Sequence, residues 1–266
     1  MAKISDVQRA LYTQRIQFYQ SVIDDLLKQE KEMFEAAQKE KPEDAALKRF
    51  ALAELMLDLC SIHVVQSGVS LAVLKIRNEN ALNEGRKALY RSVIYLEEIV
   101  TSFIDVPYSD YEEKVALLNS VDAATRYRLV RKLGFTIQLL ENSYGDNTKW
   151  RWSFVDLEGR FATVAKNIFD MRNMIANIDP RSPVYEPTVY HLRIIKKLLN
   201  QAADRYREKY ELSSHQADDF RLAILYLGAL KRLHILLNES GEVEKIKKKS
   251  DAWQEKFDAD VQKAKA

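Results

Sequence analysis

Apolar residues recur along most of this chain in alternating steps of four and three, a spacing that places them on one side of an α-helix. The clearest seam reads Tyr12, Ile16, Tyr19, Ile23, Leu26, Glu30, Met33 and Ala37. The 266 residues include only 7 Gly and 5 Pro, too few for the many turns of a β-sheet protein. These features predict an all-α protein, an extended bundle of roughly eight long amphipathic helices without a β-sheet.

Capping and turn residues predict where these helices begin and end. Ser5 is a candidate N-cap, Pro42 suits the first turn of the second helix, and the run Gly145-Asp146-Asn147 breaks the chain. We expect helices over residues 6–39, 43–77, 79–104, 109–119, 122–144, 150–178, 188–212 and 220–237, and a last one beyond Gly241. The helix over 150–178 carries an unbroken seam, from Phe154 to Ile178.

The second predicted helix is apolar on two sides, which is typical of a central helix covered by neighbours. One seam contains Leu59 and the other Leu71, and both side chains are expected to be buried. Small residues that would let another helix approach closely lie between the two seams: Ser61, Val65, Gly68 and Ala72. Residues 51–76 also carry charged and polar side chains that are costly in lipid, Glu54, Asp58, His63, Gln66 and Lys75, so no membrane insertion is expected.

Residues 180–187 form the one Pro-rich stretch and hold 3 of the 5 prolines. They cannot be helical throughout, because proline lacks a backbone donor and restricts the residue before it. The sequence therefore predicts a main helical bundle over residues 1–179, a connection over 180–187, and a C-terminal helical region over 188–266 that can pack on the first.

Residues that could support catalysis or bind a metal are few and scattered. The single cysteine, Cys60, lies in an apolar run and is expected to be a buried, inert thiol. The 4 histidines, His63, His191, His215 and His234, are far apart, and no Glu-x-x-His pair occurs. Glu54 and Asp58 are better explained as partners of basic residues than as metal ligands. With no Gly-rich phosphate loop or nucleophile motif either, we expect no enzyme activity, cofactor or metal site.

Two basic clusters and one aromatic group are the candidate binding residues. The basic clusters are Arg126, Arg128, Arg131 and Lys132, and Arg193, Lys196 and Lys197, with a further lysine run at 245–249. Most such clusters are solvated helix faces, and a phosphate-rich or acidic partner is the functional alternative. Because the net charge is only +2, nucleic acid is not favoured as a partner.

The aromatic group is Trp150, Arg151 and Trp152, at the start of a predicted helix, together with Tyr185 in the Pro-rich stretch. Two tryptophans separated by one residue point about 200° apart on a helix, so one should face away from the core. Tyrosine, tryptophan and arginine are enriched at binding hot spots, and these residues therefore predict a partner-binding surface. Because Tyr185 follows the far end of the helix that begins at the tryptophans, it can form a second patch instead of joining the first. The alternative is that they close the helix entry by packing against it.

The chain resembles the all-α sheath proteins of spirochaete flagella, of the flagellar-coiling type. The resemblance lies in its long helices, its few Gly and Pro residues and its 13 Tyr. The resemblance covers the general character of the whole chain and carries no residue motif, so it transfers no functional residues. It implies a periplasmic, lattice-forming structural role in which Met1-Ala2 replaces a removed signal. The absence of a signal peptide in this chain favours the cytoplasm instead.

These observations predict a non-enzymatic structural or scaffolding protein that acts through helix-face contacts with protein partners, in a filament such as a flagellar sheath or by self-assembly. A cytoplasmic adaptor or regulator with a groove for a peptide or helix is the first alternative. A helical bundle that binds a small ligand or a metal in its core is the second.

Overall fold

The computed structural model describes residues 5–145 and 148–265, and over these residues it contains helices and no β-strand. The long helices of this part of the chain are α1 Asp6–Ala37, α2 Pro42–Leu74, α3 Glu79–Ile99, α5 Ala123–Tyr144, α6 Arg151–Asn167, α8 Tyr185–Lys209, α9 Ala217–Leu236 and α10 Ser240–Lys265. The short elements are the helices α4 Glu112–Ala116 and α7 Met174–Asn177, the 3-10 turn η1 Tyr108–Asp110 and the π turn η2 Tyr210–Ser214. The predicted all-α class is confirmed.

The predicted helix ends agree with the observed caps at several positions. Ser5 caps α1: its hydroxyl accepts a hydrogen bond from the backbone N–H of Gln8, whose side chain accepts one from the N–H of Ser5. Pro42 is the first residue of α2. Gly145 follows α5 with a φ of +77°, a left-handed conformation that glycine adopts readily. Asp146 and Asn147, the rest of the predicted breaker, lie outside the described residues.

The chain divides into two compact units whose boundary does not coincide with residues 180–187. The first unit comprises residues 1–100, 116–121 and 128–149, and the second comprises 101–115, 122–127 and 150–266. The Pro-rich stretch lies inside the second unit, where α6 before it packs against α8 after it. Part of it is helical, since α8 begins at Tyr185 with Pro187 in its first turn. Proline is tolerated there because the first-turn N–H groups have no partner within the helix.

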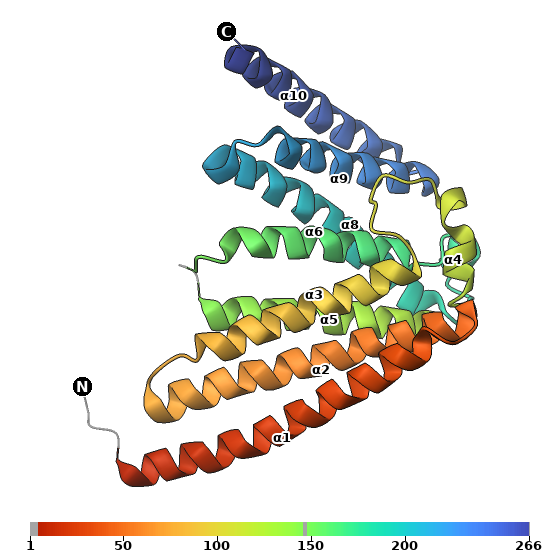
Figure 1. The fold of residues 1–266 in the computed structure, drawn as a ribbon. Helices are drawn as coiled ribbons and strands as arrows, with labels where there is room; N and C mark the ends of the chain where they lie inside the picture. The colour runs from red at the N-terminus through yellow and green to blue at the C-terminus, as the bar shows by residue number, and fades with distance from the viewer. Residues whose placement is uncertain (1–4, 146–147, 266) are drawn as a thin grey trace. The chain divides into compact units, whose positions relative to one another are not determined.

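In the first unit, α2 contacts both α1 and α3, and these helices are seen side by side in Figure 1. Its buried side chains include Leu52, Met56 and Leu59, each at most 1% exposed. Near the end of α2, Ser70 is covered and its hydroxyl donates to the carbonyl of Ile76 (2.7 Å), whereas Leu71 is 49% exposed. The prediction that both seams of this helix are buried is therefore right for Leu59 and wrong for Leu71.

The seam of α1 contains one acidic residue, Glu30, whose side chain is buried. Its carboxylate accepts hydrogen bonds from Arg91 (2.5 Å) and from the hydroxyl of Tyr95 (2.8 Å), both on α3. A buried carboxylate needs such partners because burial removes its hydration. The pKa of Tyr95 is raised, mainly because its ring is buried and in addition because its hydroxyl is bound to Glu30.

The predicted helix over residues 150–178 is interrupted, so this expectation is wrong. The observed helix α6 ends at Asn167. This residue is fully buried, and its side-chain amide donates to the carbonyls of Thr101 (2.9 Å) and Phe103 (3.1 Å). After it, the carboxylate of Asp170 accepts from the backbone N–H of Asn173 (3.2 Å), a local bond that competes with helix continuation. Consequently Ile175, which the unbroken seam would bury, is 60% exposed.

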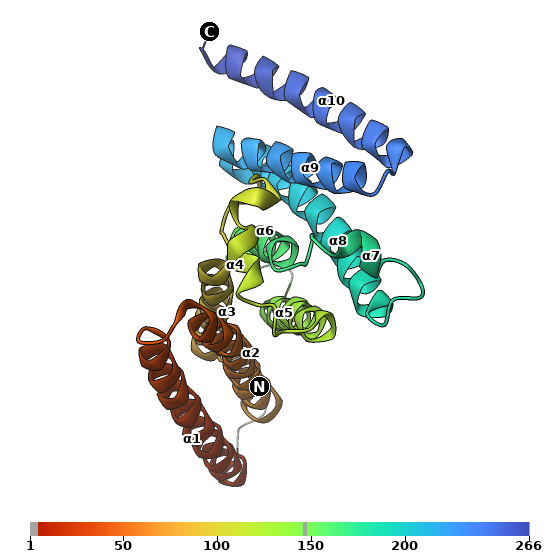
Figure 2. The same cartoon turned by 90° about the vertical axis from the view of Figure 1, so that its right-hand side faces the viewer.

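The second unit is organised as neighbouring pairs, in which α6 packs on α8, α8 on α9, and α9 on α10. Figure 2 shows the last three of these helices in succession. Between α6, α8 and α9 the rings of Tyr206 and Tyr226 stack at 5.6 Å, and the hydroxyl groups of Tyr226 and Thr163 are 3.1 Å apart. Gly159 of α6 lies directly against these rings, so the close packing depends on the missing side chain.

We expect Gly159→Ala to lower the free energy of unfolding by about 1–3 kcal/mol, the usual cost of overpacking a core. An added Cβ would lie 2.5 Å from Cε2 of Tyr206 and 2.8 Å from the hydroxyl oxygen of Tyr226, and neither stacked, buried ring can move aside freely. The measurement is urea denaturation followed by circular dichroism.

The matched control is Gly228→Ala, also within a helix of the second unit. Nothing lies within 4 Å of a Cβ built there, so the higher helix propensity of alanine should stabilise the protein by about 0.5–1 kcal/mol. Equal unfolding midpoints for the two variants would show that the Tyr206–Tyr226 stack does not depend on Gly159.

Candidate functional site

Cys60 is fully buried in α2, as predicted from its apolar surroundings. Burial raises the pKa of its thiol to about 12, because the charged thiolate is poorly solvated in the core. At neutral pH this residue is therefore a neutral thiol, which is a weak nucleophile.

The histidines are held by separate structural contacts. His191 is buried and its Nε2 lies 2.9 Å from the carbonyl oxygen of Ala165, and burial lowers its pKa to about 4. His63 lies 3.2 Å from the side-chain oxygen of Gln66, and burial lowers its pKa as well. Among the described residues no three His, Cys, Asp or Glu side chains are grouped so that they could hold a metal ion.

Glu54 and Asp58 pair with a basic residue of another helix, as the sequence indicated. The ammonium group of Lys132 on α5 lies 2.8 Å from the carboxylate of Asp58 and 3.2 Å from that of Glu54. The two carboxylates raise the pKa of Lys132 in spite of its partial desolvation. Two acidic groups against one cation leave a net negative charge on this side of α2.

The first predicted basic cluster does not form one exposed patch. Arg126, in the second unit, is 5% exposed, and its guanidinium donates to the carbonyl of Ile168 (3.0 Å). In the first unit, Lys132 is neutralised by Glu54 and Asp58, while Arg128 and Arg131 are exposed. The sequence pattern missed this division because helix spacing alone does not reveal which residues a distant segment covers.

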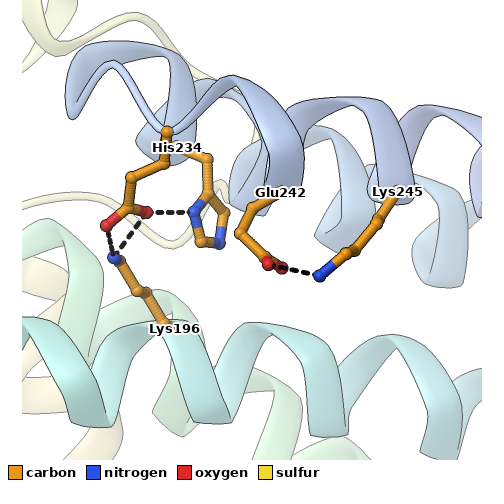
Figure 3. A network of polar contacts seen from close by, with 5 residues as sticks. Lys196, His234, Glu242 and Lys245 are labelled. Carbon is orange, nitrogen blue, oxygen red and sulfur yellow. Dashed lines mark hydrogen bonds and ion pairs between the residues drawn. The ribbon is translucent and has the colours of Figure 1, made fainter.

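The second predicted basic cluster loses one charge to an ion pair. Figure 3 shows that Lys196 of α8 reaches toward the turn that joins α9 to α10. Its ammonium group lies 2.7 Å from both carboxylate oxygens of Glu239, which also contacts Nδ1 of His234. The pKa of Glu239 is lowered, since the bonds from Lys196 and His234 outweigh the opposing effect of its partial burial. Arg193 and Lys197 remain exposed, and Arg193 lies over the ring of Tyr190 (5.7 Å).

The lysine run at 245–249 is also largely balanced by acidic residues. Lys245 pairs with Glu242 (2.7 Å), as Figure 3 shows, and Lys249 pairs with Asp204 of α8 (2.8 Å). Lys249 also lies over the ring of Trp253 (4.8 Å). Of these contacts, the pair of Lys249 with Asp204 joins α10 to α8, whereas the others lie within α10.

The predicted aromatic surface is only partly exposed, and Tyr185 does not join it. Trp150 and Trp152 are half-buried, and the exposed guanidinium of Arg151 lies over the ring of Trp152 (4.8 Å) and pairs with Glu208. Glu208 is near the end of α8, whereas Tyr185 is its first residue. With a rise of 1.5 Å per residue, the two ends of this helix are roughly 35 Å apart.

A partly buried lysine that the sequence did not single out lies between α6 and the loop before α4. Lys166 donates to the side-chain oxygen of Asn167 (3.0 Å) and to the hydroxyl of Tyr111 (3.3 Å), both neutral groups. Burial lowers its pKa to about 8, so a larger fraction of this amine is neutral at physiological pH than for an exposed lysine. Its hydrogen bonds are consistent with a structural role.

Large apolar side chains lie exposed on several helices, and the sequence reading missed most of them. In the first unit they include Phe18 of α1 (65% exposed) and Phe135 of α5 (70%), and in the second unit Leu236 of α9 (55%). Their position in the sequence could have indicated this exposure, because Phe18 and Phe135 lie outside the apolar seams that contain Tyr19 and Ile137. A large apolar residue off the buried seam of an amphipathic helix is a candidate contact residue.

Of the described helices, α2 alone is long and apolar enough to cross a membrane by length and composition. In this structure 44% of its most apolar 18-residue segment is buried against the rest of the protein. A core helix of a soluble protein meets the same criterion, so the finding is compatible with the burial of Leu52, Met56 and Leu59.

The fold and these surfaces define a class: an all-α protein of two compact helical units. The chain belongs to the TP0443 family, which it matches over residues 8–261. This is a Treponema-type protein family, in agreement with the spirochaete resemblance of the sequence. No curated protein and no solved structure matches the chain.

Proposed function

We propose that this protein is a non-enzymatic structural or scaffolding protein that acts through contacts between its helix faces and protein partners. The observation that carries the proposal is the exposure of large apolar side chains on separate helices, such as Phe18 on α1, Phe135 on α5 and Leu236 on α9. Exposed apolar side chains gain free energy when a partner removes them from water. Several such positions suit a protein that contacts more than one neighbour.

The arrangement of charges favours protein partners over polyanions. Lys132, Lys196 and Lys249, which the basic clusters of the sequence include, are paired with carboxylates of the same chain. Each such pair reduces the positive charge available to a phosphate backbone. The most perturbed titratable groups, including Cys60 and His191, are buried in the core, which supports a structural role for them.

The finer form of the proposal is a component of a flagellar filament sheath. It rests on the spirochaete resemblance and on apolar contact residues in both units, because a lattice requires several contacts per subunit. The surface around Trp150, Arg151 and Trp152 is a further candidate contact. A cytoplasmic adaptor with a single peptide or helix groove is the first alternative, and a bundle that binds a small ligand or metal in its core is the second.

The test replaces Phe18 and Phe135 together by Lys and compares the partners that cross-link to each form of the protein in its own cells. We expect the variant to lose structural partners while its free energy of unfolding changes by less than about 0.5 kcal/mol, since both positions are exposed. Gln17→Lys with Gln138→Lys is the matched control, because it adds the same charges at exposed polar positions of the same helices. The double change Trp150→Ala with Trp152→Ala tests the tryptophan surface in the same assay.

Unchanged partners in both variants would overturn the role of these faces. A melting temperature that rises strongly with a stoichiometric metal or small molecule would favour the ligand-binding alternative, because preferential binding to the folded state stabilises it.

A further inference from the structure

The outward side of α2 carries a row of mostly small residues that is left open around Val65, Gly68 and Ala72 in the described part of the chain. At the acidic end of the row, Asp58 is paired with Lys132 of α5. The row, which we call the α2 stripe, consists of Asp58, Ser61, Val65, Gly68, Ala72 and Lys75. Val65 is 40% exposed, Ala72 is exposed, and a Cβ built on Gly68 meets nothing within 4 Å. Three of the four small residues that the sequence suggested as a helix contact, Val65, Gly68 and Ala72, are thus exposed within the described chain, and Ser61 is half-buried.

Charge is confined to the two ends of this stripe. Residues 59–74 contain no Asp, Glu, Lys or Arg, and the one histidine among them, His63, is buried on the opposite side. At one end, Glu54 and Asp58 share the single cation Lys132, which leaves a net negative charge. At the other end, the exposed Lys75 has its ammonium group on the carbonyl of Ala72 (3.0 Å) and can turn toward a carboxylate.

Successive members of the stripe are separated by three, four, three, four and three residues, so the spacing is the same from either end. A two-fold axis between Val65 and Gly68 would therefore place two copies of the stripe in matching antiparallel register. Val65 would lie opposite the partner's Gly68, Ser61 opposite the partner's Ala72, and Asp58 opposite the partner's Lys75. The branched side chain of Val65 would then pack against Gly68, which has no side chain. The opposite charges of Asp58 and Lys75 would meet at both ends of the pair.

From this self-complementarity we infer that the α2 stripe pairs with the same stripe of a second copy of this chain, antiparallel and about a two-fold axis. The inference rests on the proposed function, because it names one partner for one of the helix faces. A parallel pair is disfavoured, since it would place Asp58 beside the partner's Asp58. Small residues at the crossing permit the close interaxial approach that makes helix packing effective.

A second copy explains the stripe better than a lipid surface does. Helices that lie on membranes carry basic residues along their polar face, whereas this stripe has an acidic group at one end. Nothing in lipid binding calls for the antiparallel match of Val65 with Gly68 and of Asp58 with Lys75. Lipid binding is therefore treated as an outcome that would overturn the inference.

The first test is Gly68→Glu in the full chain, with the dimer dissociation constant measured by analytical ultracentrifugation. We expect the constant to rise by at least about tenfold, because a carboxylate would be buried at the centre of the pair without a partner. Folding should be preserved, since the new side chain has open space in the single copy. The matched control is Gly228→Glu at another open helical glycine, which lies outside the stripe, and this variant should dimerise normally.

The second test fixes the register through charge exchange. Asp58→Lys alone and Lys75→Asp alone should each weaken the dimer, because like charges then meet at both ends. A mixture of the two single variants should restore pairing, as should the double variant. If dimer formation is restored neither in the mixture nor in the double variant, the antiparallel register is wrong.

A wild-type chain that stays monomeric at all accessible concentrations would overturn the inference, and so would binding to neutral phosphatidylcholine vesicles that Gly68→Glu abolishes. Neither result would affect the proposed function, whose test uses Phe18 and Phe135 on other helices. Conversely, a dimer that forms through the stripe while those two positions capture no partner would uphold this inference and reject the wider scaffold.

Discussion

Phe220→Ala is expected to lower the free energy of unfolding of the second unit by about 3–5 kcal/mol, the range for removing a buried phenyl ring. Phe220 is fully buried at the start of α9, where its ring stacks on Phe257 of α10 at 5.2 Å. It also meets Tyr210 edge-on at 4.9 Å and Trp253 at 6.3 Å. One ring thus connects η2, α9 and α10, and its loss leaves a cavity against all three.

The measurement is chemical denaturation together with limited proteolysis, in which α10 should become the first site of cleavage. Leu236→Ala is the matched control on the same helix, because Leu236 is 55% exposed and its loss should cost no more than about 0.5 kcal/mol. If both variants unfold at the same denaturant concentration, the aromatic cluster does not attach α10.

The second large effect is expected for Leu59→Ala in α2, at about 2–5 kcal/mol. Leu59 is 1% exposed in the core of the first unit, so truncation removes buried apolar surface and leaves a cavity. Leu71→Ala should cost far less, about 0.5 kcal/mol or below, because Leu71 is 49% exposed. Amphipathic periodicity alone predicts equal losses at the two positions.

Thermal and urea unfolding of the two α2 variants distinguish the interpretations. A large loss for Leu59→Ala with a small loss for Leu71→Ala supports a helix that is covered over most of its length and open near its end. Similar large losses at both positions would mean that something covers Leu71 in solution, such as the second copy inferred for the neighbouring α2 stripe. In that case the cost at Leu71 should diminish on dilution.

The seam of α1 illustrates how much of the fold could be predicted. Each of its members, from Tyr12 to Ala37, is buried or half-buried, while their neighbours mostly face solvent. The reason is local: a helix repeats every 3.6 residues, so the spacing of apolar residues determines which side is covered. Ser5 and Pro42 were predictable for the same reason, because capping depends on residues within one turn.

The break after Asn167 could not be predicted, because its cause is distant in sequence. The seam continues through Ile168 and Met171, and the helix ends because the amide of Asn167 is bound to the carbonyls of Thr101 and Phe103. The environment of the candidate binding residues also depends on segments that are distant in sequence. Arg126 looks like one member of a basic cluster until the carbonyl of Ile168 is seen to hold it in the core.

The sequence by itself determined that the chain is helical, where most helices begin, and which side of each is apolar. Only the tertiary structure decided which lysines are neutralised, why Gly159 must lack a side chain, and that Leu71, Phe135 and Val65 of the α2 stripe stay exposed. The physical reason is that helix formation and amphipathicity depend on residues within a few turns. Burial, ion pairing and free surface depend instead on which distant helix lies alongside.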